Sequence, residues 1–454
     1  MSASLKRVSN LEEMAMVPTN PPDGTAVVNP VLPAADSREA SAPGAPGGRE
    51  RIPAGLRPLF RWAPFVSSVM YVATGLTTYY TAIQTEQFDS EGKVGSLALI
   101  TTLAGLAALI AQPLVGVLSD RTRSRFGSRR PWILVGALIG TVAMLTAGLS
   151  GGIAVLTIGV CFVQFGYNML QGAFTAVLPD RVPERFRGRY STLAGLGVLI
   201  GAVLGPVFGG IFVSVIPVGY IALAGILLLL VVVFLLAVPE ADTRQKERPA
   251  FSLVAFLRGF WVNPVKHPDF AWGFLGRLFL FGAFNLSAAY QLYIAQDYVG
   301  IAAADARALV PLLSAAAVPG MIIGTVVAGP LSDRLGRRKP LVLIAGLIIF
   351  ASALAPLISP TVGGLFAATM LAGLGFGAFI AVDQALMSSL LPDESAYGKD
   401  MGVLNIAAAL PIVISPAVAG LVVLTFGSYA ALYVAQAVIV LVGALAVVPI
   451  RSVR

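Results

Sequence analysis

The sequence predicts an all-α integral membrane protein in which twelve transmembrane helices form two pseudo-symmetric six-helix bundles. Three observations support this fold class: an apolar composition, apolar stretches of membrane-spanning length, and an internal repeat. Of the 454 residues, 57% are hydrophobic and 12% are charged, whereas soluble proteins have about 45–50% apolar and about 25% charged residues. A soluble core cannot bury this excess. We therefore expect most apolar residues to face lipid.

The first 58 residues differ from the rest of the chain. They are rich in Pro, Gly and Ala, as in residues 42–48, and cannot bury enough surface to offset the entropy of ordering. We expect a disordered tail over residues 1–58, a first bundle over 59–238, a linker over 239–269 and a second bundle over 270–454.

Apolar stretches of about 20 residues recur from Trp62 onward, each long enough to cross roughly 30 Å of hydrocarbon as a helix. They do not alternate with a period of two, as the strands of a transmembrane barrel would. The predicted helices cover residues 62–84, 94–118, 131–149, 153–178, 190–214, 217–238, 270–296, 308–331, 340–358, 361–391, 400–424 and 429–449.

Basic residues gather in alternate loops, which predicts the orientation in the membrane. They lie between the second and third, the fourth and fifth, and the eighth and ninth spans, whereas only Lys93 and Arg307 lie on the other side. We therefore expect a plasma (inner) membrane protein with both termini and the linker in the cytoplasm. The net charge of +8 is explained by this topology, without a nucleic-acid partner.

The chain has one cysteine, Cys161, and one histidine, His267. This excludes a disulfide framework and a Cys/His zinc site, and it leaves no plausible base for a Ser or Cys nucleophile within the membrane. We expect no enzymatic activity, cofactor or metal.

The two halves of the chain share landmarks at one displacement. Gly116–Arg121 recurs as Gly329–Arg334, and Leu178–Asp180 recurs as Leu391–Asp393, both 213 residues later. Parallel repeats of this kind place a substrate site at the midplane between two bundles.

The repeated loops resemble the signature of the major facilitator superfamily, Gly-x-x-x-Asp-Arg followed by Gly-x-Arg-Arg. The first copy has an insertion over residues 122–126, and the second has none. The resemblance covers about residues 60–450 and implies alternating access by a protein that usually works as a monomer. The matching residues are Gly116, Asp120, Arg121, Gly127, Arg129 and Arg130, then Gly329, Asp333, Arg334, Gly336, Arg337 and Arg338.

Two narrower resemblances concern the substrate. Residues 119–131 are similar to the corresponding loop of sucrose/proton symporters and their glycoside-transporting relatives, although residues 153–179 lack the acidic residue of helix 4 found in the plant symporters. Their coupling site therefore cannot be carried over. Residues 201–210, Gly-x-x-x-Gly-Pro-x-x-Gly-Gly, are similar to a motif of drug/proton antiporters, but the same pattern also predicts close helix packing with a bend.

Asp120 and Asp333 lie at helix ends beside several arginines. Charge-assisted hydrogen bonds there can hold the cytoplasmic helix ends together and break when the halves move. We expect a gating latch formed by the twelve motif residues; the alternative is that the arginines only determine topology.

Two ionisable residues lie deep within predicted spans, Arg277 in the seventh and Asp383 in the tenth. At about 1.5 Å per residue, both are roughly 12–13 Å from the cytoplasmic boundary, and the family resemblance puts both helices beside the central cavity. We predict that they pair and that Asp383 is the proton-sensitive group, because burial disfavours the charged carboxylate whereas the arginine favours it. The alternatives are a permanent ion pair or an arginine that snorkels to the surface.

Amides, hydroxyls and aromatic rings on five spans suit a neutral polyhydroxylated ligand, although each could instead join neighbouring helices, at about 0.6 kcal/mol on average. The residues expected to line the cavity are Tyr71, Thr74, Thr78, Gln164, Tyr167, Asn168, Gln171, Asn285, Tyr290, Gln291, Gln384 and Asn405.

These features together predict a secondary active transporter that carries a sugar or glycoside with protons as the coupling ion. The alternative of the same fold is a drug/proton antiporter, and the alternative of another class is a receptor or assembly factor that transports nothing.

Overall fold

The computed structural model describes residues 52–245, 266–388, 390 and 397–451. Most of the predicted tail and linker, and the repeat landmark at residues 391–393, lie outside this part of the chain. The side chains of Gln384 and Asn405, both predicted to line the cavity, are also outside what the structure describes. Within the described residues the protein is helical and contains no strand.

Twelve helical spans follow one another along the described chain, which confirms the predicted fold class. The first half consists of α1 (Arg57–Phe88), α2 (Lys93–Arg121), α3 (Arg130–Gly148), α4 (Ile153–Thr175) continued by α5 (Val177–Arg181), α6 (Glu184–Ile211) and α7 (Ile216–Ala237). The second half consists of α9 (Pro268–Leu286), the short α10 (Gln291–Tyr293), α11 (Ala303–Leu335), α12 (Lys339–Ile358), α13 (Val362–Ser388), α14 (Tyr397–Phe426) and α15 (Tyr429–Leu445).

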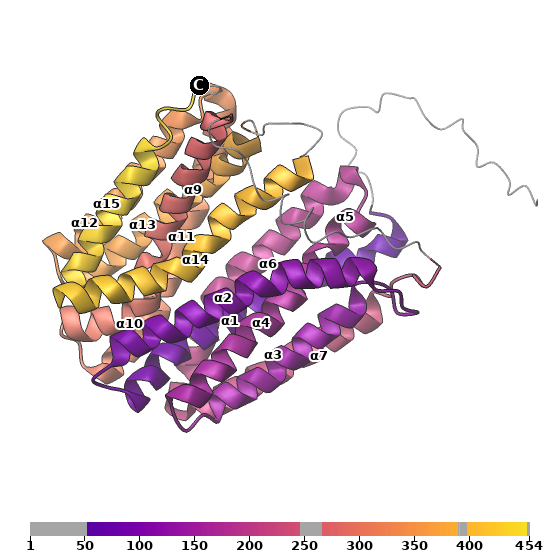
Figure 1. Cartoon of the computed structure of the whole chain (residues 1–454), viewed down its shortest axis with the longest axis horizontal. Coiled ribbons are helices and arrows are strands. Elements are labelled where there is room, and N and C mark those ends of the chain that lie inside the picture. Colours follow the sequence, from indigo (N-terminus) through magenta and orange to yellow (C-terminus); the bar gives the residue numbers. More distant parts are fainter. Residues whose placement is uncertain (1–51, 246–265, 389, 391–396, 452–454) are drawn as a thin grey trace, which may run out of the picture. The chain divides into compact units, whose positions relative to one another are not determined.

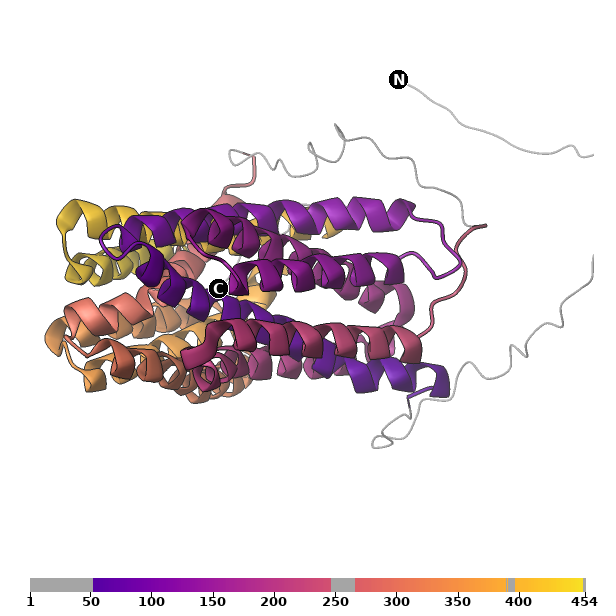
Figure 2. The same ribbon diagram turned by 90° about the horizontal axis from the view of Figure 1, so that it is seen from below.

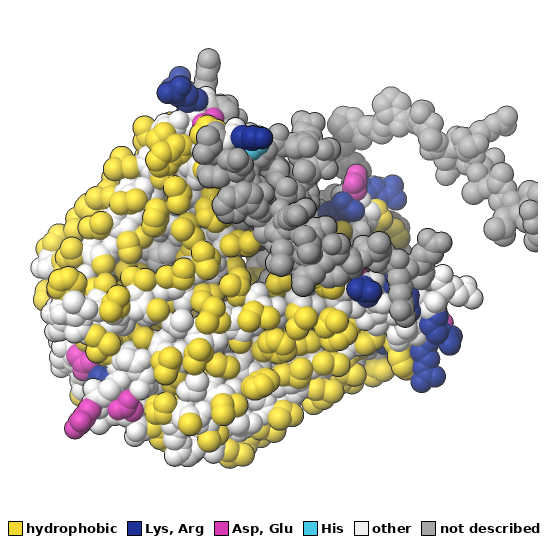
Figure 3. All heavy atoms as spheres, in the orientation of Figure 1, with side chains coloured by type: hydrophobic (Ala, Val, Ile, Leu, Met, Phe, Trp, Pro, Cys, Tyr) yellow, Lys and Arg dark blue, Asp and Glu magenta, His cyan; other side chains and the backbone are white. Residues whose placement is uncertain are grey.

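Length and composition support membrane insertion of these helices. Ten helical segments in the described chain are long and apolar enough to cross a membrane, and α15 is a shorter apolar helix. The first span, α1, is 32 residues long but contains more Thr, Tyr and Gln residues than the other spans. In Figure 3 hydrophobic side chains are spread over the coloured part of the face in view, and charged side chains gather at its ends.

The two halves repeat the same packing pattern. In the first half α1 contacts α6 and α2 contacts α4; in the second half α9 contacts α14 and α11 contacts α13. The halves meet where α2 contacts α14 and α6 contacts α11. Figures 1 and 2 show these halves side by side, with the first half in indigo to magenta and the second in orange to yellow.

Glycines in α6 allow α1 to approach closely. A Cβ added at Gly201 would lie 2.2 Å from the carbonyl oxygen of Ser68, and one at Gly205 would lie 2.8 Å from the Cα of Gly75. The pattern over residues 201–210 is therefore explained by helix packing, because any side chain there would push the helices apart. The helix continues through Pro206 to Ile211.

The seventh span is divided, a feature that the apolar pattern over residues 270–296 does not reveal. The helix α9 ends at Leu286, a 3-10 turn covers Ala288–Tyr290, and a π turn covers Ile294–Tyr298 after α10. Irregular turns of this kind are frequent at functional sites because they redirect side chains. Here they direct Ser287 and Gln291 into a pocket described below.

Candidate functional site

Four places in the structure bear on function: the two motif loops, a buried ion pair, the polar side chains within the halves, and a charged cluster between the halves. We call the end of the helices that carries residues 116–130 and 329–338 the motif end. The end that carries residues 89–92 and 299–302 is called the opposite end.

In the first motif loop, one arginine joins two acidic residues. Arg129 Nη2 lies 2.6 Å from Asp120 Oδ1, at the end of α2, and Arg129 Nε lies 2.8 Å from Asp180 Oδ2, in α5. The Arg129 side chain is 11% exposed, so these charge-assisted bonds are partly shielded from water. All three residues belong to the first half, and the cluster therefore holds the second and fourth spans together.

Glu240, just after α7, holds the same loop from the other side. Its carboxylate accepts hydrogen bonds from the backbone N–H groups of Ser128 (2.9 Å), Arg129 (3.1 Å) and Arg130 (3.2 Å). These N–H groups begin α3 and have no partner within the helix, so an acidic cap there is favourable. Gly127 precedes them at φ +93°, where glycine is strongly preferred. Sequence reasoning missed Glu240 because 110 residues separate it from Arg130.

The second motif loop is arranged differently. Gly336 ends α11 at φ +59°, and Lys339 donates to the carbonyl of Ile450. Asp333 is exposed and forms no ion pair with another described residue. Among the described residues, Asp333 thus lacks the ion pair that Asp120 forms in the first loop.

The motif glycines Gly116 and Gly329 lie inside α2 and α11. A Cβ added at either position would meet no atom within 4 Å. Packing in this conformation therefore does not require glycine at either position.

Arg277 and Asp383 form an ion pair between α9 and α13. Arg277 Nη1 lies 3.3 Å from Asp383 Oδ2, with the side chains 12% and 4% exposed. Asp383 Oδ1 and Arg277 Nε are buried and have no hydrogen-bond partner among the described residues. The guanidinium carbon lies 5.5 Å from the ring centre of Phe281. These are the two ionisable residues that we predicted to pair because they lie at equal depth in the membrane, and the structure brings them together.

Several of the residues predicted to line the cavity form hydrogen bonds within the first half. Gln171 donates to the hydroxyl of Tyr71 at 3.1 Å, which joins α4 to α1. Asn168 accepts from Gln112 at 2.9 Å and donates to the backbone carbonyl of Gln164. The remaining hydroxyls, those of Thr74 and Thr78, donate to carbonyls of their own helix.

Other predicted lining residues take part in packing. Tyr167 is buried, and its hydroxyl contacts the sulfur of Met144 in α3. Tyr290 is also buried and donates to the carbonyl of Pro416 in α14. Asn285 donates to the carbonyl of Phe281, one turn earlier. Tyr167 and Tyr290 were predicted to line the cavity, but both are buried between helices and their hydroxyls already contact protein atoms.

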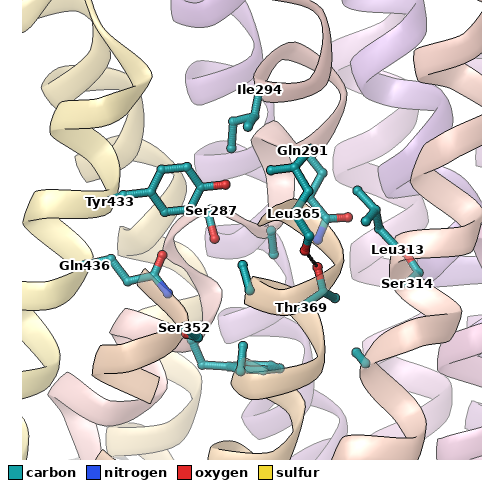
Figure 4. A pocket seen from close by; sticks show the side chains of 15 residues that line it. Ser287, Gln291, Ile294, Leu313, Ser314, Ser352, Leu365, Thr369, Tyr433 and Gln436 are labelled. Atoms are coloured by element: carbon teal, nitrogen blue, oxygen red, sulfur yellow. Dashed lines mark hydrogen bonds between the residues drawn. The ribbon is translucent and has the colours of Figure 1, made fainter. Parts of the chain in front are cut away.

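A pocket of about 100 Å³, lined by both apolar and polar residues, lies inside the second half. Its walls come from α9 to α13 and from α15, and Figure 4 shows polar side chains pointing into it. Gln291 is the one predicted lining residue that it contains. The polar residues around it are Ser287, Gln291, Ser314, Ser352, Thr369, Tyr433 and Gln436.

At the opposite end, charged and polar side chains from both halves form a cluster. Lys93, which begins α2, lies 3.2 Å from Glu86 and 3.0 Å from Asp297. Arg307 lies 3.8 Å from Glu86, and Tyr429 donates to Asp297 at 3.0 Å. Lys93 and Arg307 are the two cations that topology had assigned to this side; their acidic partners were not predicted.

This geometry can now be compared with known proteins. The family model of the Major Facilitator Superfamily matches residues 65–322 and 278–453, most of the chain. The chain belongs to the major facilitator superfamily. Its relatives in this superfamily are transporters, which agrees with a membrane protein that is not an enzyme.

Two relatives are named for sugars. Lactose permease of Lactobacillus delbrueckii subsp. bulgaricus is 30% identical over 152 residues, which make up 30% of this chain and 24% of the permease. Sucrose transport protein SUT2 of Oryza sativa subsp. indica is 34% identical over 131 residues, 23% of this chain and 26% of that protein. The matched segments thus span about a quarter of each relative.

A third relative is named for a substrate that is not a sugar. The 4-hydroxybenzoate transporter PcaK of Pseudomonas aeruginosa is 40% identical over 91 residues, 20% of each chain.

Solved structures of superfamily members share the fold. The nucleoside transporter NupG aligns with a TM-score of 0.70 at 15% identity, over 86% of this chain and 99% of NupG. A bacterial homologue of the human lysosomal transporter Spinster, in an inward-facing and unoccupied conformation, aligns with a TM-score of 0.65 at 14% identity, over 88% and 95% of the two chains.

Proposed function

We propose that this transporter couples the uptake of a sugar or glycoside to protons by alternating access. The observation that carries the proton-coupling part is the buried Arg277–Asp383 ion pair. A charge within a membrane span costs about 2.5–3.5 kcal/mol on insertion scales, so such residues generally have a functional partner.

The pair links protonation to a change in local interactions. When Asp383 is ionised, it neutralises Arg277; when it is protonated, the guanidinium loses its charged partner in a largely apolar region. An unpaired buried charge is strongly unfavourable. Proton binding therefore favours a conformation in which Arg277 reaches another acceptor or water, and this difference between states is what coupling requires.

The substrate class rests on weaker but concordant support. The loop over residues 119–131 resembles that of sucrose symporters, and two relatives are named for lactose and sucrose. The polar groups within the halves are mostly amides and hydroxyls, which suit a neutral polyol. By contrast, the segment over residues 201–210 packs α6 on α1 and so adds nothing to the case for a drug exporter.

We place the motif end in the cytoplasm of a cell whose plasma membrane holds the protein, because the basic loops lie there. The cluster around Lys93 joins the halves at the opposite end. We infer that this conformation is closed toward the outside. The Asp120–Arg129–Asp180 cluster holds spans of the first half together in this conformation, and we propose that it joins a latch between the halves only when the motif end closes.

Transport by purified protein in liposomes tests this proposal. With an inward proton gradient, labelled sugar should accumulate; Asp383→Asn should abolish accumulation and its dependence on external pH, yet preserve exchange of labelled for unlabelled sugar. Asp242→Asn is the matched control, because Asp242 is an exposed carboxylate in the loop after α7. Full uphill accumulation by Asp383→Asn contradicts the coupling role, and gradient-driven efflux of a dye in place of sugar uptake contradicts the substrate class.

A further inference from the structure

The pocket inside the second half lies nearer the opposite end than the Arg277–Asp383 pair does. Ser287, one of its lining residues, follows Arg277 by ten residues, which is about 15 Å of helix toward the opposite end. The described residues that line the pocket all belong to the second half. Under the proposed orientation the pocket is therefore on the outer side of the ion pair, the side from which protons enter during uptake.

The size and the lining of the pocket suit water. Its volume is about 100 Å³, and a water molecule takes about 30 Å³ in the liquid, so the space holds about three waters. Of the described residues that line it, none is acidic, basic or histidine. The hydroxyls of Ser314, Ser352 and Thr369 donate to carbonyls of their own helices and keep lone pairs that can accept from water.

Gln436 is the residue that most requires a partner in this pocket. It is 3% exposed, its Oε1 has no hydrogen-bond partner among the described residues, and its amide points into the pocket in Figure 4. A buried amide oxygen without a partner is destabilising, and such groups are rare in native proteins unless a water or ligand completes them. A buried water needs several polar partners, and Ser287, Gln291 and Tyr433 supply further polar groups around the same space.

A series of aromatic contacts joins the pocket to the ion pair. Phe284 lines the pocket and stacks on Phe376 in α13, with the ring centres 3.8 Å apart. The ring centre of Phe376 lies 5.2 Å from that of Phe281, which lies 5.5 Å from the guanidinium carbon of Arg277. Arg277 in turn contacts Asp383. Apolar rings, which offer no hydrogen bonds along which a proton can pass, thus stand between the pocket and the carboxylate.

We propose that the pocket holds a cluster of about three waters and forms the outer part of the proton route to Asp383, a route that the Phe284–Phe376 stack closes in this conformation. The proposal rests on the proposed proton coupling through Asp383. A proton from outside passes along the hydrogen bonds of the waters and, once the rings separate, adds to the Asp383 carboxylate; only O–H bonds form and break. The closed stack prevents a leak that would dissipate the proton gradient.

Hydroxyl-radical footprinting of the purified full-length protein in detergent tests for the waters, because radicals formed from bound water modify the side chains beside it. Tyr433 and Tyr220 are both buried, at 5% and 0% exposure, but only Tyr433 lines the pocket. We expect Tyr433 to be modified about fivefold faster, because buried water is held beside it. Equal rates for the two tyrosines would show a dry pocket and overturn the proposal.

A variant that fills the pocket assigns this modification to the waters within it. Ala368→Leu places a larger side chain in the pocket and should slow the modification of Tyr433 to the rate of Tyr220. Ala367→Leu is the matched control, because Ala367 is exposed on the same helix, and it should leave the rate unchanged. A rate that stays high in Ala368→Leu would place the water elsewhere and overturn the proposal.

Proton flux into liposomes without sugar, followed with a pH-sensitive dye trapped inside, tests the route. Phe284→Ala opens the stack, and we expect the flux to rise about tenfold because an apolar barrier to a charge is removed. Phe284→Leu keeps more of the packing and should give a smaller rise. Adding Asp383→Asn to Phe284→Ala should restore the native flux, since the route passes through this carboxylate. Phe162→Ala, which removes a ring that is 53% exposed on α4, should not raise it.

The outcomes distinguish this route from the proposed coupling itself. If Asp383→Asn abolishes sugar accumulation but neither Phe284→Ala nor Phe284→Leu raises the proton flux, the coupling stands and the route is overturned. A raised flux that persists after Asp383→Asn is added also overturns the route. Full accumulation of sugar by Asp383→Asn refutes the coupling and the route together, even when the footprint shows a hydrated pocket.

Discussion

Lys93 Nζ lies 3.0 Å from Asp297 Oδ1 and so joins the first half of the transporter to the second at the end opposite the motif loops. The same ammonium group contacts Glu86 and lies 4.8 Å from the ring centre of Tyr293. Tyr293 in turn donates to the carbonyl of Ala82 in α1. These contacts must break whenever the opposite end opens, so their strength sets how often it does.

Removing one charge of this cluster should open the opposite end more often. For Asp297→Asn we expect the closed state of this end to lose about 1 kcal/mol of stability, the upper range for a partly exposed ion pair. A cysteine placed by Ala98→Cys in a Cys161→Ala background should then react with a thiol reagent about fivefold faster. Ala98 is a suitable reporter because its Cβ packs on Gly420 of the second half. Asp305→Asn, an exposed carboxylate at the same end, should not change the rate. Equal labelling in both variants would show that the cluster does not hold this end closed.

The motif glycines should matter for movement and not for the stability of this conformation. Gly116→Ala should raise the free energy of unfolding by about 0.5–1 kcal/mol, because it replaces glycine inside a helix with no clash. Transport should nevertheless slow if α2 packs closely at this point when the motif end closes. Gly225→Ala in α7 is the control, since a Cβ there also meets nothing within 4 Å; it should give the same stability and normal transport. Normal transport by Gly116→Ala would exclude such close packing.

The carboxylate that caps α3 should be structural. Glu240→Ala should lower the free energy of unfolding by about 1–2 kcal/mol, the usual cost of removing a helix cap, and this would be measured by thermal or denaturant unfolding. Glu184→Gln removes a carboxylate that is 88% exposed and should have almost no effect. If the two variants unfold alike, the hydrogen bonds of Glu240 to the α3 backbone contribute no net stability.

Removing one member of the Arg277–Asp383 pair should destabilise the protein, whereas replacing both with apolar side chains should be tolerated. Arg277→Met alone leaves an unpaired buried carboxylate, and we expect the free energy of unfolding to fall by about 3–5 kcal/mol. The double variant Arg277→Met with Asp383→Leu should recover most of this loss, because two apolar side chains pack well in such a region. It should still fail to accumulate sugar against a gradient. Uphill transport by the double variant would refute the coupling role.

The sequence predicted the fold and one long-range contact because both follow from periodicity and depth. Apolar stretches of helical length define the spans, and Arg277 and Asp383 could be paired because each lies at the same distance from a boundary. The repeat located both motif loops. These inferences need only the spacing of residues along the sequence and the known rise per residue of a helix.

The remaining features depend on contacts between distant segments. Glu240 lies in a loop far along the chain from the α3 backbone that it caps, and nothing in its neighbourhood marks it as a cap. The break after Leu286 occurs without a glycine or proline at that point. Gln436 was overlooked because it lies on the twelfth span, whereas most of the polar residues singled out lay on spans expected beside the central cavity.

The glycine contacts between α6 and α1 have a consequence for how the halves can move. Where backbone lies against backbone, no side chain can change its rotamer to let one helix slide past the other. The two spans therefore shift together as one piece. Relative movement is left to the contacts of α2 with α14 and of α6 with α11.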